Sequence, residues 1–313
     1  MHEDERDVRE RDVRERLASH ADEYEVRDRL HDVPPHVTYE VALDGRRAVC
    51  KLATSDDGDP PTEARIAQHV GANTSVPVPR VLAVGDDHFV AAHRTDLPDG
   101  PTVDERRART MGAGLATLHE ETGFDAPGFL GASDGDLALD ARASWHETVC
   151  DLLGSRRDFL RNRDFDGEYA AVADDALAFV REHPGLLAGA GDPVLCHGNY
   201  LPDHVGTDGG DVTCVIDFEH ALAGPAEYDY WRTAMPLLGN EDGRVESAFR
   251  AGYESVRPLP AGFDERGDVY RLVNTVSYFR SLFLQENHTG TEAERRAERM
   301  AEYVRDAVAS LGE

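Results

Sequence analysis

Short apolar runs alternate with polar residues through the first hundred positions, a pattern typical of β-strands. The runs predict strands over Tyr24 to Leu30, Val37 to Leu43, Arg47 to Leu52, Val81 to Val84 and His88 to His93. Asp44-Gly45 predicts a hairpin turn, and Ile66 and Val70 at helical spacing after Pro60-Pro61 predict a helix. Opposite charges three and four residues apart from Glu3 to about Ser19 predict an exposed N-terminal helix. We therefore expect five antiparallel strands that carry one helix.

The hydrophobic period becomes helical beyond residue 100. The stretch Leu97-Pro98-Asp99-Gly100-Pro101 is unsuited to regular structure and predicts a linker. After it, apolar residues share one face of a helix from about Val103 to Thr122, and further helical patterns continue to the end of the chain. We therefore expect an α+β fold with two domains, residues 1–97 and the mostly helical residues 98–313.

Polar residues gather near position 200, where two short apolar runs end. The runs Pro193 to Cys196 and Val212 to Ile216 predict strands. Six polar residues lie after these runs: His197, Asn199, Asp203, His204, Asp217 and Glu219. Any one of them alone is explained by a turn with solvated acids and a capping asparagine. Together they predict a pocket that contains hydrogen-bond donors, metal ligands and a base.

This stretch resembles the catalytic block of the aminoglycoside phosphotransferase and choline kinase superfamily. The family pattern His-Gly-Asp-x-x-x-x-Asn is matched by His197-Gly198-Asn199-x-x-x-x-His204, and Ile-Asp-[Trp/Phe]-Glu is matched by Ile216 to Glu219. Gly224 to Asp229 resembles the segment that follows these motifs in the family.

The resemblance implies a kinase-like fold of two lobes, a small one built on the five-stranded sheet and a large helical one. It also implies ATP, a divalent metal (magnesium or manganese) and a small-molecule substrate. His197, Asn199 and Asp217 are the implied catalytic residues, and Asp217 and His204 are the implied metal ligands.

Lys51 is the only lysine in the chain, and it follows an apolar run. The resemblance makes it the lysine that holds nucleotide phosphates, with Glu63 on the next helix as its ion-pair partner. Chance explains a single lysine, and the helix dipole explains an acid in a first turn, but their spacing favours the pair. Thr38 is expected to offer the nucleotide a hydroxyl. Ala92 to Thr95, which includes Arg94, matches the hinge whose backbone meets adenine.

The resemblance breaks at the positions nearest the chemistry. The loop expected from His31 to His36 contains two prolines and no glycine, so it offers phosphates fewer amide donors. Asn199 replaces the carboxylate that accepts or orients the substrate hydroxyl, and an amide cannot take a proton; Asp203, Glu219 or water would then be the base. His204 replaces a metal-binding asparagine, and imidazole suits manganese, zinc or cobalt better than magnesium.

The charge balance restricts the possible partners. The chain has 61 acidic and 33 basic residues, and its formal charge of −28 opposes binding to nucleic acid or to anionic membranes. Acids spread through every segment indicate a halophilic protein. A charged N-terminus and the lack of a long apolar run predict a cytoplasmic protein. The four cysteines have no metal-binding spacing and are expected to be buried thiols. Neither substrate nor oligomeric state is indicated.

Two functional hypotheses follow from these patterns. The first is an ATP-dependent phosphotransferase that acts on a hydroxyl of a small molecule. The second is a nucleotide-binding pseudokinase that acts as a sensor or partner-binding module, because the replacements at Asn199 and His204 affect groups that phosphoryl transfer needs.

Overall fold

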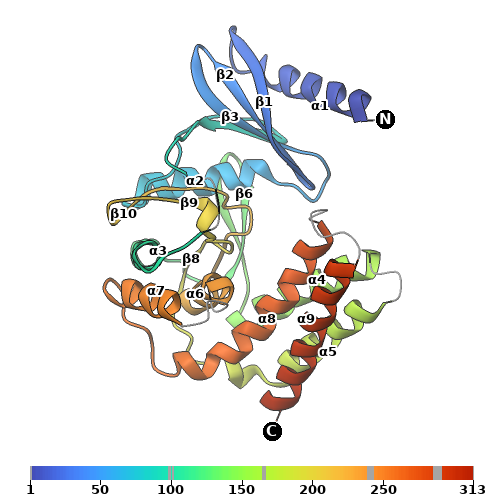
Figure 1. Ribbon diagram of the computed structural model, residues 1–313, viewed down its shortest axis with the longest axis vertical. Helices are drawn as coiled ribbons and strands as arrows, with labels where there is room; N and C mark the ends of the chain where they lie inside the picture. The colour runs from blue at the N-terminus through green and yellow to red at the C-terminus, as the bar shows by residue number, and fades with distance from the viewer. Residues whose placement is uncertain are drawn as a thin grey trace. The chain divides into compact units, whose positions relative to one another are not determined.

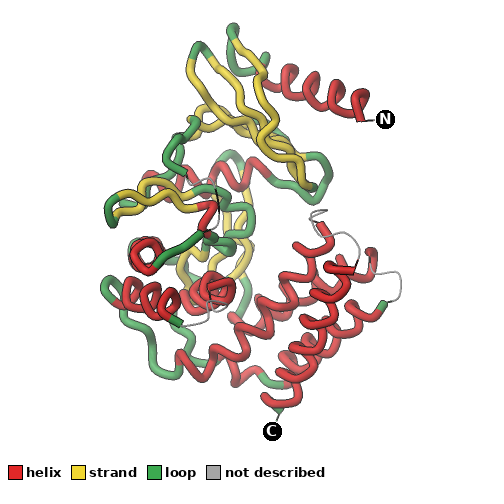
Figure 2. The backbone as a smooth tube through the Cα atoms, in the orientation of Figure 1, coloured by secondary structure: helices red, strands yellow, loops and turns green. Residues whose placement is uncertain are grey.

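The structure is a computed structural model that describes residues 2–97, 100, 102–163, 167–237, 243–284 and 291–312. The chain forms two compact units (Figures 1 and 2). The first comprises Met1–Val103, Leu130–Ala138 and Leu201–Ala221, and the second comprises Asp104–Phe129, Leu139–Tyr200 and Leu222–Glu313. Three residues of the predicted linker, Pro98, Asp99 and Pro101, lie outside the described residues.

An antiparallel sheet of five strands forms the core of the first unit, in the order β1-β2-β3-β5-β4. Its strands are β1 (Tyr24–Val33), β2 (His36–Leu43), β3 (Arg46–Ala53), β4 (Val81–Val84) and β5 (His88–Ala92). Asp44 and Gly45 join β2 to β3, and both have the positive φ that a tight hairpin turn requires. The predicted five-stranded sheet is confirmed.

The loop predicted from His31 to His36 is wrong, because the hairpin ladder continues through most of it. His31 pairs with Thr38, and Val33 pairs with His36, so that only Pro34 and Pro35 form the turn. Proline cannot donate to a ladder, but at the turn itself no ladder bond is needed. The first unit therefore has a two-residue turn where the resemblance places a phosphate-covering loop.

Two helices pack on this sheet. Helix α1 (His2–Leu17) was predicted to be exposed. One side of it is instead buried, because Val13 and Leu17 lie in the core beside the sheet. Apolar residues four apart fall on one face of a helix and supply this contact. Helix α2 (Pro60–Asn73) begins at Asp59, whose side chain accepts a hydrogen bond from the Thr62 amide.

A second hairpin belongs to the first unit. It consists of the 3-10 turn η2 (Pro202–His204), β9 (Val205–Asp208) and β10 (Asp211–Val215). The Val215 amide donates to the Pro77 carbonyl at 2.8 Å. This hairpin ends directly before the segment that contains Asp217 and Glu219, and so determines where these two carboxylates lie.

Helices make up most of the second unit, as Figure 2 shows in red. They are α3 (Glu105–Glu120), α4 (Trp145–Arg163), α5 (Glu168–Glu182), α6 (Ala226–Ala234), α7 (Arg244–Glu254), α8 (Phe263–Leu284) and α9 (Thr291–Leu311), with 3-10 turns η1 (Pro184–Leu187) and η3 (Met235–Leu237). Helices α3 and α7 approach closely, since a Cβ built at Gly112 would lie 2.1 Å from the Phe249 carbonyl oxygen. The helical character predicted beyond residue 100 is confirmed. No described helix has the length and apolar character needed to cross a membrane.

A four-stranded sheet, in the order β7-β6-β11-β8, was only partly predicted. Strand β8 (Pro193–Cys196) was expected, whereas β6 (Gly128–Ser133), β7 (Asp136–Ala141) and β11 (Leu222–Pro225) were not. These three strands are rich in glycine, alanine and other residues of weak strand propensity, so tertiary pairing rather than local sequence forms them. Strand β8 is important for the site because it leads directly into His197.

Candidate active site

Lys51 lies on β3, which is paired on both sides within the sheet of the first unit. Its Nζ atom lies 2.7 Å from Glu63 Oε2, 2.7 Å from Asp217 Oδ1 and 3.0 Å from Glu219 Oε2. Burial opposes the charged form, but the three carboxylates raise the pKa of Lys51 well above its ordinary value. The ammonium therefore stays charged at the centre of an acidic cluster.

Glu63 reaches Lys51 from the first turn of α2. Its side chain is buried, and burial raises its pKa to about 7 although Lys51 opposes this shift. The expected ion pair between β3 and α2 is thus present. It fixes the position of the ammonium, which is what phosphate binding by a single lysine requires.

Asp217 follows β10 in an unusual backbone conformation. Its φ of 68° lies in the left-handed region, which non-glycine residues adopt at a cost of about 1–3 kcal/mol when the surroundings enforce it. Burial tends to raise its pKa, but the nearby Lys51 ammonium outweighs this and lowers the pKa to about 2. Its second oxygen, Oδ2, lies 3.4 Å from His204 Nε2. An ionised carboxylate and an imidazole therefore face each other at this point.

Glu219 is contacted by two more histidines. Its Oε2 atom lies 2.8 Å from His36 Nδ1, and its Oε1 atom lies 3.3 Å from His220 Nε2. Burial would raise the pKa of Glu219, but the hydrogen bond from His36 and the charge of Lys51 hold it far below its usual range. Together with Asp217 and Glu63, Glu219 forms a group of carboxylates whose ligand atoms lie within 4.8 Å of one another.

The other predicted nucleotide-binding residues lie on or near the same sheet. Thr38 on β2 is the register partner of Lys51, and Ala92 ends β5. The Arg94 guanidinium pairs with Asp96 and donates to the Thr213 carbonyl oxygen at 2.6 Å. The side chain of Arg94 therefore ties the segment after β5 to β10, which leaves its backbone as the part suited to meet a base.

In the second unit, the loop after β8 is held by Asp229 on α6. The Asp229 carboxylate accepts hydrogen bonds from the amides of His197 at 2.6 Å and Gly198 at 2.9 Å. The Arg232 guanidinium donates to the Gly198 carbonyl oxygen. The main-chain amide of Asn199 donates to His197 Nδ1 at 3.2 Å, and the Asn199 side chain is half-buried. The predicted catalytic loop is thus fixed through its backbone.

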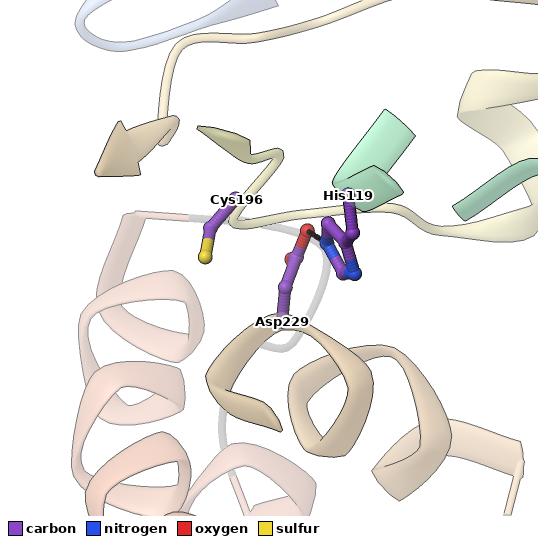
Figure 3. A group of neighbouring side chains, drawn as sticks. All are labelled: His119, Cys196 and Asp229. Carbon is purple, nitrogen blue, oxygen red and sulfur yellow. Dashed lines mark hydrogen bonds and ion pairs between the residues drawn. The ribbon is translucent and has the colours of Figure 1, made fainter. Parts of the chain in front are cut away.

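His119, Cys196 and Asp229 form the buried group drawn in Figure 3. His119 lies 3.1 Å from Asp229 Oδ2 through Nε2 and 2.8 Å from the Tyr253 hydroxyl through Nδ1. The Cys196 thiol donates to the Gly224 carbonyl oxygen. His119 is therefore a core histidine whose two ring nitrogens both have partners. Because the partners of Asp229 already occupy both of its oxygens, this group is suited to support the loop rather than to bind a ligand.

The six polar residues singled out near position 200 are divided between the two units. His204, Asp217 and Glu219 join Lys51 in the first unit, where Asp203 is exposed, whereas His197 and Asn199 belong to the second unit. Sequence reasoning missed His36 and Arg232. Arg232 lies three residues beyond Asp229, within reach of the same loop, and this spacing could have revealed it. Nothing in the sequence marks His36. The described cysteines are buried and free, as expected.

Residues 36–266 match the model of the phosphotransferase enzyme family. The chain belongs to the phosphotransferase enzyme family. Among curated proteins, it is 27% identical over 232 residues to a probable ketoamine kinase of Vibrio parahaemolyticus, covering 69% of this chain and 72% of that one.

Two solved structures have the same fold as this phosphotransferase. A candidate fructosamine-3-kinase from Haemophilus somnus has a TM-score of 0.66 at 15% identity, over 93% of this chain and 95% of that one. A thermostable mutant of an aminoglycoside phosphotransferase, solved with ADP and hygromycin B, has a TM-score of 0.64 at 16% identity, over 96% and 98% of the two chains. The predicted α+β kinase-like fold and family are therefore confirmed.

The predicted function is confirmed as that of a small-molecule phosphotransferase. No match favours the pseudokinase hypothesis. Family membership also supports ATP and a divalent metal in general terms.

Proposed function

We propose that this protein transfers the γ-phosphoryl group of ATP to a sugar hydroxyl of a ketoamine, a sugar joined to an amine. The observation that carries the proposal is the contact of Lys51 Nζ with Glu63 and Asp217, both at 2.7 Å, in a family of phosphotransferases. The substrate class is taken from the ketoamine kinase that the chain resembles. The acidic composition of the present chain also suits an amine-bearing substrate.

Lys51 is proposed to bind the nucleotide phosphates, with Glu63 holding the ammonium in place. Phosphoryl transfer depends chiefly on such positioning and on neutralising the charge of the transferred group. Thr38, Ala92 and Arg94 are proposed to complete the nucleotide site. In this view, residues 1–97 form a small nucleotide-binding lobe and residues 98–313 supply the large helical lobe, although the compact unit that contains Lys51 also takes in Leu130–Ala138 and Leu201–Ala221.

The donor set around Asp217 fits a divalent metal. An ionised carboxylate and an imidazole, Asp217 and His204, are common ligands of first-row divalent ions, and Glu219 adds a second carboxylate nearby. When bound, a divalent ion would neutralise negative charge on the phosphates. Since His204 offers nitrogen where magnesium prefers oxygen, we infer a preference for manganese over magnesium.

Asn199 and His197 are proposed to serve the acceptor hydroxyl. The Asn199 amide can orient the hydroxyl but cannot take its proton, so the proton must pass to another carboxylate or to water. The loop is held by Asp229 and Arg232 through contacts to the main chain of His197 and Gly198. Because Asn199 cannot act as the base, we expect a slow enzyme.

The test is ADP formation by the purified protein in concentrated salt, with manganese or magnesium. A fructose-derived ketoamine is compared with its two parts, the free sugar and the free amine. We expect ADP formation that requires the intact ketoamine and is lost in Lys51→Met. Equal turnover on free sugar would overturn the substrate class. No turnover on any hydroxyl compound would overturn the proposed activity.

A further inference from the structure

His36 is the first residue of β2, and its imidazole is buried beside the acid motif with 7% of the side chain exposed. Its Nδ1 atom lies 2.8 Å from Glu219 Oε2, and the same oxygen lies 3.0 Å from Lys51 Nζ. One carboxylate oxygen is thus shared between an imidazole and the ammonium. The direction of the Glu219 carboxylate therefore depends on both His36 and Lys51.

The imidazole has little freedom to move, because the segment before α2 closes over it. The Thr54 amide donates to the Pro35 carbonyl oxygen at 2.7 Å. A Cβ built at Gly58 would lie 2.8 Å from that same oxygen and 3.0 Å from His36 Nε2. Only glycine leaves room at position 58 for both the turn and the ring. The turn, the ring and the glycine therefore form one packed unit.

Packing alone does not explain a histidine at this position. His36 Nε2 is buried and has no hydrogen-bond partner among the described residues. Leaving a buried polar atom unpaired opposes folding, and an apolar side chain of similar volume would avoid that cost. What histidine supplies is the Nδ1 hydrogen bond to Glu219. The side chain is therefore explained by what it does to that carboxylate.

We propose that His36 is a positioning residue of the phosphotransfer site, which fixes Glu219 and thereby the Lys51 ammonium, and that Gly58 makes room for its ring. The inference rests on the proposed function of Lys51. It gives the proline turn a role that differs from a phosphate-covering loop. The turn carries no amide donors at its two prolines, and instead delivers a side chain that orders the groups beneath it.

Two amide substitutions separate this role from packing. His36→Asn keeps a nitrogen at the position of Nδ1, whereas His36→Gln moves the nitrogen to the position of Nε2. His31→Gln is the matched control, because His31 is exposed on β1 of the same hairpin. Since Lys51 is the only lysine, isotope-labelled lysine gives one side-chain NMR signal that reports its surroundings without any need for turnover.

We expect His36→Gln to shift the lysine signal and to lower kcat/KM for ATP by about tenfold or more. A loss of this size is common when a group that orients a metal-binding side chain is removed. His36→Asn and His31→Gln should both stay close to wild type in both measurements. A lysine signal unchanged in His36→Gln, or equal losses in His36→Asn and His36→Gln, would overturn the proposal. A wild type without turnover would overturn the proposed function, while the lysine signal would still decide the role of His36.

Discussion

The two polar clusters of this protein differ in how completely their charges are matched. In the first unit, the Lys51 ammonium faces three carboxylates, and the side chains of Asp217 and Glu219 remain 23% exposed. In the second unit, the buried Asp229 carboxylate accepts hydrogen bonds on both oxygens. An excess of negative charge at partly exposed groups is suited to receive a metal ion with a nucleotide. A saturated, buried network is suited to hold a loop in place.

The largest effect is expected where the saturated network is broken. Asp229→Ala leaves the buried amides of His197 and Gly198, and His119, without their acceptor. Removing one member of a buried charged network costs about 3–5 kcal/mol. We expect the free energy of unfolding to fall by this amount in urea, followed by the fluorescence of Trp145 and Trp231, which both belong to the second unit.

The matched control is Asp158→Ala, which removes an exposed carboxylate from α4 of the same unit. A surface change of this kind should alter the free energy of unfolding by less than about 0.5 kcal/mol. If both variants behaved alike, Asp229 would not be the support of the loop.

The second effect concerns chemistry rather than support. Asn199→Asp restores a group that can accept the proton of the acceptor hydroxyl, and general-base catalysis contributes about 10²-fold or more. We expect kcat to rise by about that factor with the substrate found in the ADP assay. Asn162→Asp on the exposed face of α4 is the control. An unchanged kcat in Asn199→Asp would mean that another group already takes the proton.

Sequence and structure agree best where local patterns and tertiary contacts favour the same element. The five strands follow alternation and turn residues, and Lys51 and Glu63 meet because β3 and α2 are placed by strong local signals. The strands β6, β7 and β11 were missed because small residues carry no strand signal of their own.

The site shows the same division. Family motifs located Asp217 and His204, which face each other at 3.4 Å. His36 could not be found from its own sequence, since its role comes from a contact with a residue 183 positions away, Glu219. The loop expected around it became a two-residue turn because backbone pairing extended the hairpin, an outcome that two prolines do not prevent when they occupy the turn itself.

A smaller effect is expected at the proposed metal ligands beside Lys51. His204→Asn replaces a nitrogen ligand by an amide oxygen, which magnesium accepts more readily. We expect the ratio of manganese affinity to magnesium affinity to fall by about tenfold, measured by calorimetry in the presence of a nonhydrolysable ATP analogue. His31→Asn on the exposed part of β1 should leave the ratio unchanged. An unchanged ratio in His204→Asn would remove His204 from the proposed ligands.

The smallest effect is the pH dependence of the stability that Asp229 contributes. Burial would raise the pKa of Asp229, but hydrogen bonds from His119 and Gly198 lower it below its ordinary value. Its contribution to stability is therefore complete above the ordinary aspartate pKa of about 3.9 and disappears as pH falls through the lower pKa of the folded state. In wild type, the unfolding midpoint should decline more steeply below pH about 4 than in Asp229→Asn. Equal slopes would show that this carboxylate does not titrate as described.

We propose that the Lys51 cluster receives a metal-bound nucleotide. The most direct test is the thermal shift of wild type and Lys51→Ala with ATP and manganese or magnesium in concentrated salt, with Arg46→Ala as an exposed basic control on the same strand. Nucleotide at about one hundred times its dissociation constant should stabilise wild type by about 2.7 kcal/mol. We expect this shift in wild type and in Arg46→Ala, and its loss in Lys51→Ala. An equal shift in Lys51→Ala, or no shift in wild type with either metal, would contradict it.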